Sequence, residues 1–173
     1  MLTNEIMEAY IAILEEELVP AMGCTEPIAI AYAAAILCKT LGAEPSEIRA
    51  ELSGNIIKNV KSVIVPATGG MHGIEAAVAA GIVSNAPLKQ LEVLVGLTND
   101  DVPQIEGFMD TCNIHISELE TDKPFEVKMF GTHNTDSAYV HLADRHTNVV
   151  AVNKNDTDLT DNYAIFEVSE EVD

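Results

Sequence analysis

The feature that most constrains this fold is a run of residues that offers no polar face. From Ile28 to Leu41 the chain is apolar on nearly all sides. A helix of this kind has to be buried, because it leaves no surface for water. Pro27 suits its first turn and Gly42 suits the position just after its end. We therefore predict a buried, alanine-rich helix inside a compact soluble domain.

Other elements are expected around it. Asn4 can cap an amphipathic helix that Pro20 ends. Alternation of apolar and polar residues predicts a short strand at 48–52, and helical turns are expected at 55–60. Small apolar residues predict a closely packed helix at 73–83. The apolar run 88–97 is ambiguous, and we favour a helix followed by a strand.

The second half changes to the two-residue alternation typical of half-buried strands. These strands are expected at 113–116, 125–129, 137–142 and 147–152, as successive antiparallel neighbours. The polar stretch 156–162 is expected to be mobile. Helices followed by strands indicate an α+β fold: N-terminal helices with a buried alanine-rich helix, then a mostly antiparallel sheet. We expect 1–173 to form a single domain, with a possible subdomain seam near 98–101.

Charge and cysteine content limit the classes of function. The chain carries 28 acidic against 9 basic residues, a formal charge of -19. Such a surface repels nucleic acids and anionic membranes, so neither is expected as a partner. The longest apolar stretch, 28–38, is shorter than the roughly 20 residues of a membrane-spanning helix. The 3 cysteines form no CxxC pair, which suits a reducing compartment. We expect a cytoplasmic protein.

Cys24 is the first candidate for chemistry. It immediately precedes the predicted start of the buried helix at Thr25 or Glu26, where the helix dipole and free backbone N–H groups lower a thiol pKa. The alternative is a small residue in a tight loop. Cys38 and Cys112 lie in an apolar helix and before a strand, and we interpret both as inert.

Two further segments could bind a ligand. Asn55, Lys58 and Asn59 fall at i, i+3 and i+4, so a helical turn would present them on one face able to hold a carboxylate. The alternative is a solvated helix edge. Thr68 and Gly69, with the following glycine, could form a backbone nest for an anion, or simply a turn.

Metal and nucleotide sites have little support. The 5 histidines show no HExxH pattern, although His141 and His146 could meet across a hairpin. Each is more simply a surface or capping residue. Walker, G-x-S-x-G and G-x-G-x-x-G motifs are absent. We predict no metal ligands in this chain.

Taken together, several segments resemble the N-terminal part of the L-cysteine desulfidase family, which is related to iron–sulfur L-serine dehydratases. The most specific is Gly23-Cys24-Thr25-Glu26-Pro27, followed by the alanine-rich helix. The segments 53–59, 63–69 and 146–150 look similar to later blocks of that family, in the same order.

The resemblance implies cleavage of L-cysteine to pyruvate, ammonia and sulfide, or dehydration of L-serine, with a [4Fe-4S] cluster as cofactor. It makes Cys24 the catalytic thiol or base. Substrate-binding roles are then expected for Thr25, Glu26, Asn55, Lys58, Asn59, Thr68 and Gly69.

Family members are longer, and their cluster ligands lie in a C-terminal dehydratase-type domain. We therefore expect the chain to need that domain or subunit as a partner, to lack the cluster and to be inactive when isolated. Association into a homo-oligomer is also expected if an apolar surface is left bare. The rival hypotheses are a non-catalytic amino-acid-binding or assembly module, and a histidine-based metal site.

Overall fold

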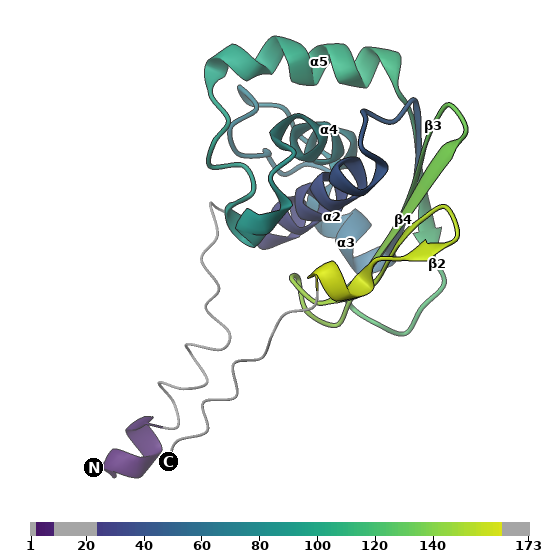
Figure 1. The fold of residues 1–173 in the computed structure, drawn as a ribbon. Coiled ribbons are helices and arrows are strands. Elements are labelled where there is room, and N and C mark those ends of the chain that lie inside the picture. Colours follow the sequence, from purple (N-terminus) through teal and green to yellow (C-terminus); the bar gives the residue numbers. More distant parts are fainter. Residues whose placement is uncertain (1–2, 9–23, 164–173) are drawn as a thin grey trace.

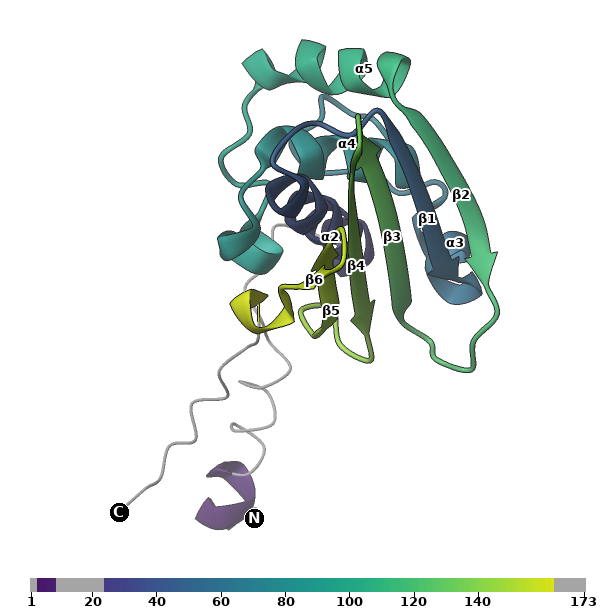
Figure 2. The ribbon, with the colours of Figure 1, turned by 45° about the vertical axis from the view of Figure 1, so that its right-hand side comes forward.

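The computed structural model describes residues 3–8 and 24–163, and shows a layer of helices packed on one face of a sheet (Figures 1 and 2). The α+β fold predicted from the sequence is confirmed. The alanine-rich helix α2 (Thr25–Leu41) lies between the sheet and helix α4 (Ile74–Ser84), as its composition requires. None of the helices in the described ranges is long and apolar enough to cross a membrane.

The helices within the described ranges include those predicted at 28–41, 55–60 and 73–83, and one further helix that was not predicted. They are α2 (Thr25–Leu41), α3 (Gly54–Val60), α4 (Ile74–Ser84) and α5 (Val102–Thr111), with 3-10 turns η1 (Pro87–Glu92), η2 (Asn99–Asp101) and η3 (Thr160–Tyr163). Helix α2 ends at Gly42, which adopts φ 79° and donates its N–H to the Cys38 carbonyl. Glycine supports this left-handed conformation without a steric penalty.

The strands form a 6-stranded sheet in the order β2-β1-β3-β4-β5-β6. They are β1 (Glu47–Ser53), β2 (Asn113–Leu119), β3 (Glu126–His133), β4 (Asp136–Ala143), β5 (Val149–Lys154) and β6 (Thr157–Asp158). All neighbouring pairs in this sheet are antiparallel except β1 and β2, which are parallel. The sheet is therefore mostly antiparallel, as expected.

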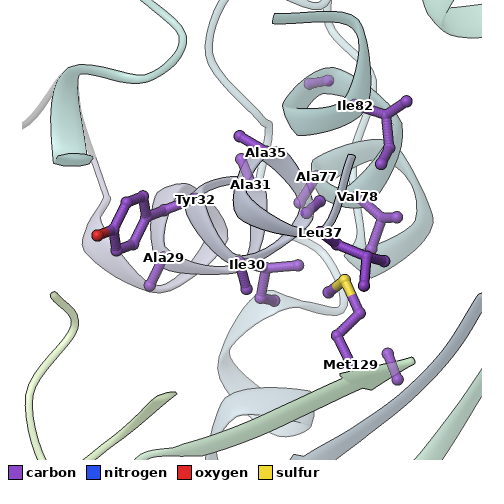
Figure 3. Packing of buried hydrophobic residues seen from close by; sticks show 14 of the residues in the cluster. Ala29, Ile30, Ala31, Tyr32, Ala35, Leu37, Ala77, Val78, Ile82 and Met129 are labelled. Atoms are coloured by element: carbon purple, nitrogen blue, oxygen red, sulfur yellow. The ribbon is translucent and has the colours of Figure 1, made fainter. Parts of the chain in front are cut away.

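The core is organised around α2. Fourteen of its 17 residues are buried, and Figure 3 shows its side chains directed both toward α4 and toward Met129 of β3. Ile30, Ile36 and Leu37 are fully buried. Burial of one such side chain contributes about 1.5–3 kcal/mol. The alanines on the remaining positions let neighbouring elements approach closely.

The closest approach is between α2 and α4. A Cβ atom added to Gly81 of α4 would lie 2.8 Å from the Cα of Ala31 in α2, and nearer still to its carbonyl oxygen. Glycine at this position is therefore a packing requirement, because any side chain would push the two helices apart.

The sheet has one covered and one uncovered face. Val127, Met129, Val140 and Val152 point inward and are fully buried, in line with the two-residue alternation of a strand. Their neighbours on the same strands are partly exposed, except for the buried Glu126, and no described element lies over that outer face (Figure 2). This arrangement explains why the strand signal in the sequence alternates, whereas the α2 signal does not.

Three local predictions need correction. The segment 88–97 contains no strand, because Gln90 at φ 49° interrupts the chain and Leu91, Val93 and Leu94 are buried in the core, in a region where η1 contacts α2. The polar stretch 156–162 contains β6 and part of η3. Strand β2 is also not an antiparallel neighbour of β3. It pairs in parallel with β1 after a long helical crossover, as parallel strands require.

The expected seam at 98–101 is the start of a helical segment. Thr98 and Asp101 form a reciprocal capping box that leads into α5, a helix that the apolar pattern did not reveal. One hydrophobic cluster includes residues from both sides of it, such as Val78 and Val140. Of the predicted first helix, residues 4–8 are helical and the rest lies outside the described residues.

The helix crossing yields a stability prediction. Gly81→Ala is expected to destabilise the fold by about 3 kcal/mol, since overpacking at a rigid contact costs about 1–3 kcal/mol or more. The matched control is Gly107→Ala in α5, where an added Cβ meets nothing within 4 Å. That change is expected to be neutral or to stabilise by up to about 1 kcal/mol. Urea unfolding of both variants checks this, and equal effects would contradict it.

Candidate functional site

Cys24 is the N-cap residue of α2. Its backbone is extended, at φ -62° and ψ 130°, and its side chain makes no capping hydrogen bond. The thiol instead donates to Glu26 Oε2, with 3.4 Å between sulfur and oxygen. Cys24 is exposed, so the sulfur is accessible to a reagent or ligand.

The thiol pKa differs from the expectation. Desolvation raises the pKa of Cys24, and the hydrogen bond to Glu26 and its negative charge raise it further. The backbone amides of Glu26 and Thr25 lower the pKa, as expected for a helix start, but they are outweighed. The prediction of a lowered thiol pKa is therefore wrong, because a carboxylate two residues away favours the protonated thiol.

His146 belongs to the same group, although the sequence placed it only among candidate metal ligands. It lies in the β4–β5 connection, and its ring centroid is 4.6 Å from that of Phe125. Burial lowers the pKa of His146, whereas the negative charge of Glu26 raises it. Glu26 therefore interacts with both a thiol and a largely neutral imidazole. Among the described residues, no lysine or arginine forms an ion pair with it.

The second predicted group is placed as the spacing implied. Asn55, Lys58 and Asn59 lie on α3 and all three are exposed. Helix α3 directly follows β1 and contacts α2 (Figure 1). The predicted polar face therefore exists, and its role in binding stays a prediction.

Thr68 and Gly69 have a structural explanation. The Thr68 hydroxyl is buried and donates to the Val65 carbonyl at 2.7 Å, and it accepts from the Met71 N–H at 3.1 Å. A Cβ on Gly69, at φ 71°, would contact Val102 in the first turn of α5. Figure 1 shows α5 at the top of the molecule and α3 toward its lower end. Thr68 therefore stabilises its own loop, and Gly69 lies close to the first turn of α5.

The described residues do not fit a metal cluster. They contain no group of three histidine, cysteine or acidic side chains arranged to hold a metal ion. Cys38 and Cys112 are buried, and burial raises the pKa of each to about 11. Such thiols are poor ligands, since metals bind the thiolate. A cluster bound elsewhere in a longer protein stays a prediction on which these residues do not bear.

Sequence reasoning missed a second polar cluster on the sheet. His141 Nε2 lies 2.8 Å from Glu126 Oε1, and Thr121 donates to Glu126 Oε2 at 2.5 Å. Burial by itself raises the pKa of Glu126, but these hydrogen bonds outweigh it and the pKa is lowered. His141 therefore pairs with Glu126, not with His146 across the hairpin. The contact depends on strand register, which left no motif in the sequence.

Comparison with known proteins identifies relatives that are all named UPF0597 protein. A UPF0597 protein of Treponema denticola is 46% identical over 149 residues, which is 86% of this chain and 35% of that protein. UPF0597 proteins of Desulfitobacterium hafniense and Clostridium perfringens are 44% and 39% identical over 148 and 166 residues, or 34% and 38% of their own length. The chain thus spans about a third of the length of these curated relatives. No family model and no solved structure matches it.

These relatives correct the family assignment. They are named UPF0597 proteins, and not L-cysteine desulfidases or L-serine dehydratases. The prediction of an iron–sulfur-dependent lyase, with Cys24 as its catalytic thiol or base, is therefore wrong. That inference rested on the Gly-Cys-Thr-Glu-Pro segment and three later short blocks, whereas the relatives align over most of the chain.

The effect of Glu26 on the thiol can be tested directly. Glu26→Gln removes the negative charge beside Cys24, so we expect a lower thiol pKa and faster alkylation by iodoacetamide near neutral pH. The rate is measured against pH, with Cys24→Ser to identify the reacting thiol. Glu106→Gln, an equal charge change on the exposed side of α5, serves as control and should leave the rate unchanged. An unchanged rate in Glu26→Gln would contradict the assignment.

His146 should make stability depend on pH. Because its folded-state pKa is lowered, protonation opposes folding. Its contribution is fully present above the ordinary histidine value of about 6.5 and is lost as the pH falls through the folded-state pKa. We expect the free energy of unfolding to fall less steeply between about pH 7 and 5 in His146→Gln than in the unaltered chain. Parallel slopes in chemical denaturation would count against this.

Proposed function

We propose that this chain is a binding module of a longer protein and holds a small amine-bearing ligand, such as an amino acid, at Glu26. The observation that carries the proposal is the setting of this carboxylate. It receives a hydrogen bond from the neutral Cys24 thiol and acts electrostatically on His146, and within the described ranges no lysine or arginine pairs with it. An ammonium group is the partner that would complete it.

The proposed ligand carries two charges. An ammonium group would pair with Glu26, and a carboxylate would meet Lys58 with the amides of Asn55 and Asn59 on α3. We also include Thr25 in the proposed binding site, because it directly follows Cys24 in the chain. Because the thiol and the imidazole are neutral, neither repels the ammonium group of the ligand. The charge of Glu26 therefore makes this position selective for the ammonium group.

The length of the relatives supports a further part of the proposal. Since they are about two and a half times as long as this chain, the site would be completed by an additional domain or subunit. A cytoplasmic location is also proposed, and free cysteines at positions 24, 38 and 112 support it because they suit a reducing compartment.

The test is a titration of isotope-labelled protein followed by NMR. L-serine, L-cysteine and L-alanine are compared with ethylamine and propionate, which carry only one of the two charges. Saturable shifts are expected at residues 24–27 and 54–60 for the amino acids, weaker ones for ethylamine, and none for propionate. Binding should also slow alkylation of Cys24.

Variants separate Glu26 from general effects. Glu26→Gln should weaken amino-acid binding by about tenfold, which is about 1.4 kcal/mol, whereas Glu106→Gln should leave it unchanged. Loss of saturable shifts for every amino acid and for ethylamine, up to about 20 mM, would overturn the proposal.

A further inference from the structure

The uncovered face of the sheet carries a continuous stack of one cation and two rings. The Arg49 guanidinium carbon lies 4.3 Å from the centroid of the Phe130 ring. The rings of Phe130 and Tyr139 are stacked, with centroids 4.7 Å apart and an angle of 30° between their planes. Arg49, Phe130 and Tyr139 are cross-strand neighbours on β1, β3 and β4. The register of the sheet therefore builds this stack.

Arg49 has hydrogen-bonding capacity that its surroundings do not use. Stacking engages the face of the guanidinium, whereas its five N–H donors lie in the plane of the group. Its ion pair with Glu51 is 4.0 Å long between Nε and Oε1, which exceeds a hydrogen bond, and the side chain is 57% exposed. Contact with Phe130 thus fixes the orientation of a cation whose donors remain open.

A hollow lies beside this stack. Its volume is about 270 Å³, and Arg49, Phe130 and Tyr139 line it together with Thr132, Ser137 and Asn153. Within the described part of the chain, the side chains of these last three residues make no hydrogen bond, whereas that of the nearby Asn155 is engaged with Ser137 N–H and Asp136. Hydroxyl and amide donors therefore accompany the guanidinium around one small hollow.

We propose that this hollow binds a small ligand that carries an oxyanion, either a carboxylate or a phosphate, on a flat ring. The oxyanion accepts hydrogen bonds from Arg49, whose planar donors match such groups in a bidentate manner. Asn153 and the hydroxyls supply further donors. The ring lies against the edges of Phe130 and Tyr139 that line the hollow, since aromatic groups favour edge-to-face as well as offset contacts.

The negative net charge of the chain limits how an anion can bind in the hollow. At -19, the protein as a whole repels anions, so general attraction does not account for their binding. Glu51 beside Arg49 adds to this repulsion. An anion that binds here must therefore use the directed donors of the hollow.

The inference is independent of the proposed amine site. That site is at the start of α2, in the helical layer (Figure 2), whereas the hollow is lined by residues of β1, β3, β4 and β5. The two sites also favour ligand groups of opposite charge, so either can fail without the other.

The experiment is an NMR titration at constant ionic strength with four probes: benzoate, phenyl phosphate, acetate and inorganic phosphate. We expect saturable shifts at residues 130–132 and 137–139 with the ring-bearing probes, and weaker ones with acetate or inorganic phosphate. Benzoate against phenyl phosphate shows which oxyanion is preferred. Absence of saturable shifts there with every probe, up to about 20 mM, overturns the proposal.

Variants test the two parts of the site separately. Arg49→Gln should weaken the ring-bearing probes by about tenfold or more. Lys128→Gln is the matched control. It removes one positive charge from the same face of the sheet, but Lys128 is on β3 and does not line the hollow. If both variants weakened probe binding equally, the effect would come from the loss of positive charge in general and not from the donors of Arg49, and the proposal would be overturned.

Arg49→Lys keeps the charge and loses the planar fork, so it should also weaken binding, and it remains informative if Arg49→Gln fails to fold. Tyr139→Leu should abolish the preference for benzoate over acetate. An unchanged preference would contradict the role of the ring.

Discussion

Burial of α2 is the constraint on which the rest of the structure depends. The helix has no polar side, so the sheet must cover it from one direction and α4 with η1 from another (Figure 3). Close contact between α2 and α4 is possible only because Gly81 faces Ala31 without a side chain. Leu91, Val93 and Leu94, from a segment predicted to include a strand, are buried and complete this cover.

This arrangement leaves the two layers with different tasks. The inner face of the sheet packs against the helices, whereas no described element covers the side chains on its outer face. Polar groups are consequently found in two places, at the beginning of α2 and on the outer face of the sheet. In each place a charged group lacks a full complement of partners: Glu26 in the first, Arg49 in the second.

The environment of Cys24 shows how local effects compete. A helix start favours a thiolate, and the backbone amides there do lower the thiol pKa. Desolvation and the nearby carboxylate outweigh them, so the thiol stays protonated. The negative charge of the same carboxylate also raises the pKa of His146, a residue more than a hundred positions later in the chain. The start of α2 therefore presents a carboxylate beside a protonated thiol, and not an activated thiolate nucleophile.

Local sequence determined the elements of this protein: the buried helix that Gly42 ends, the alternating strands, and the polar face of Asn55, Lys58 and Asn59. These follow from burial and backbone geometry, which act over a few residues. Only the tertiary structure decided that β2 pairs in parallel with β1, that His146 joins Glu26, and that Arg49 stacks on Phe130. Such contacts depend on strand register and helix crossing, which bring together residues far apart in the chain. Periodicity specifies which face a residue occupies, but not which residue lies opposite it.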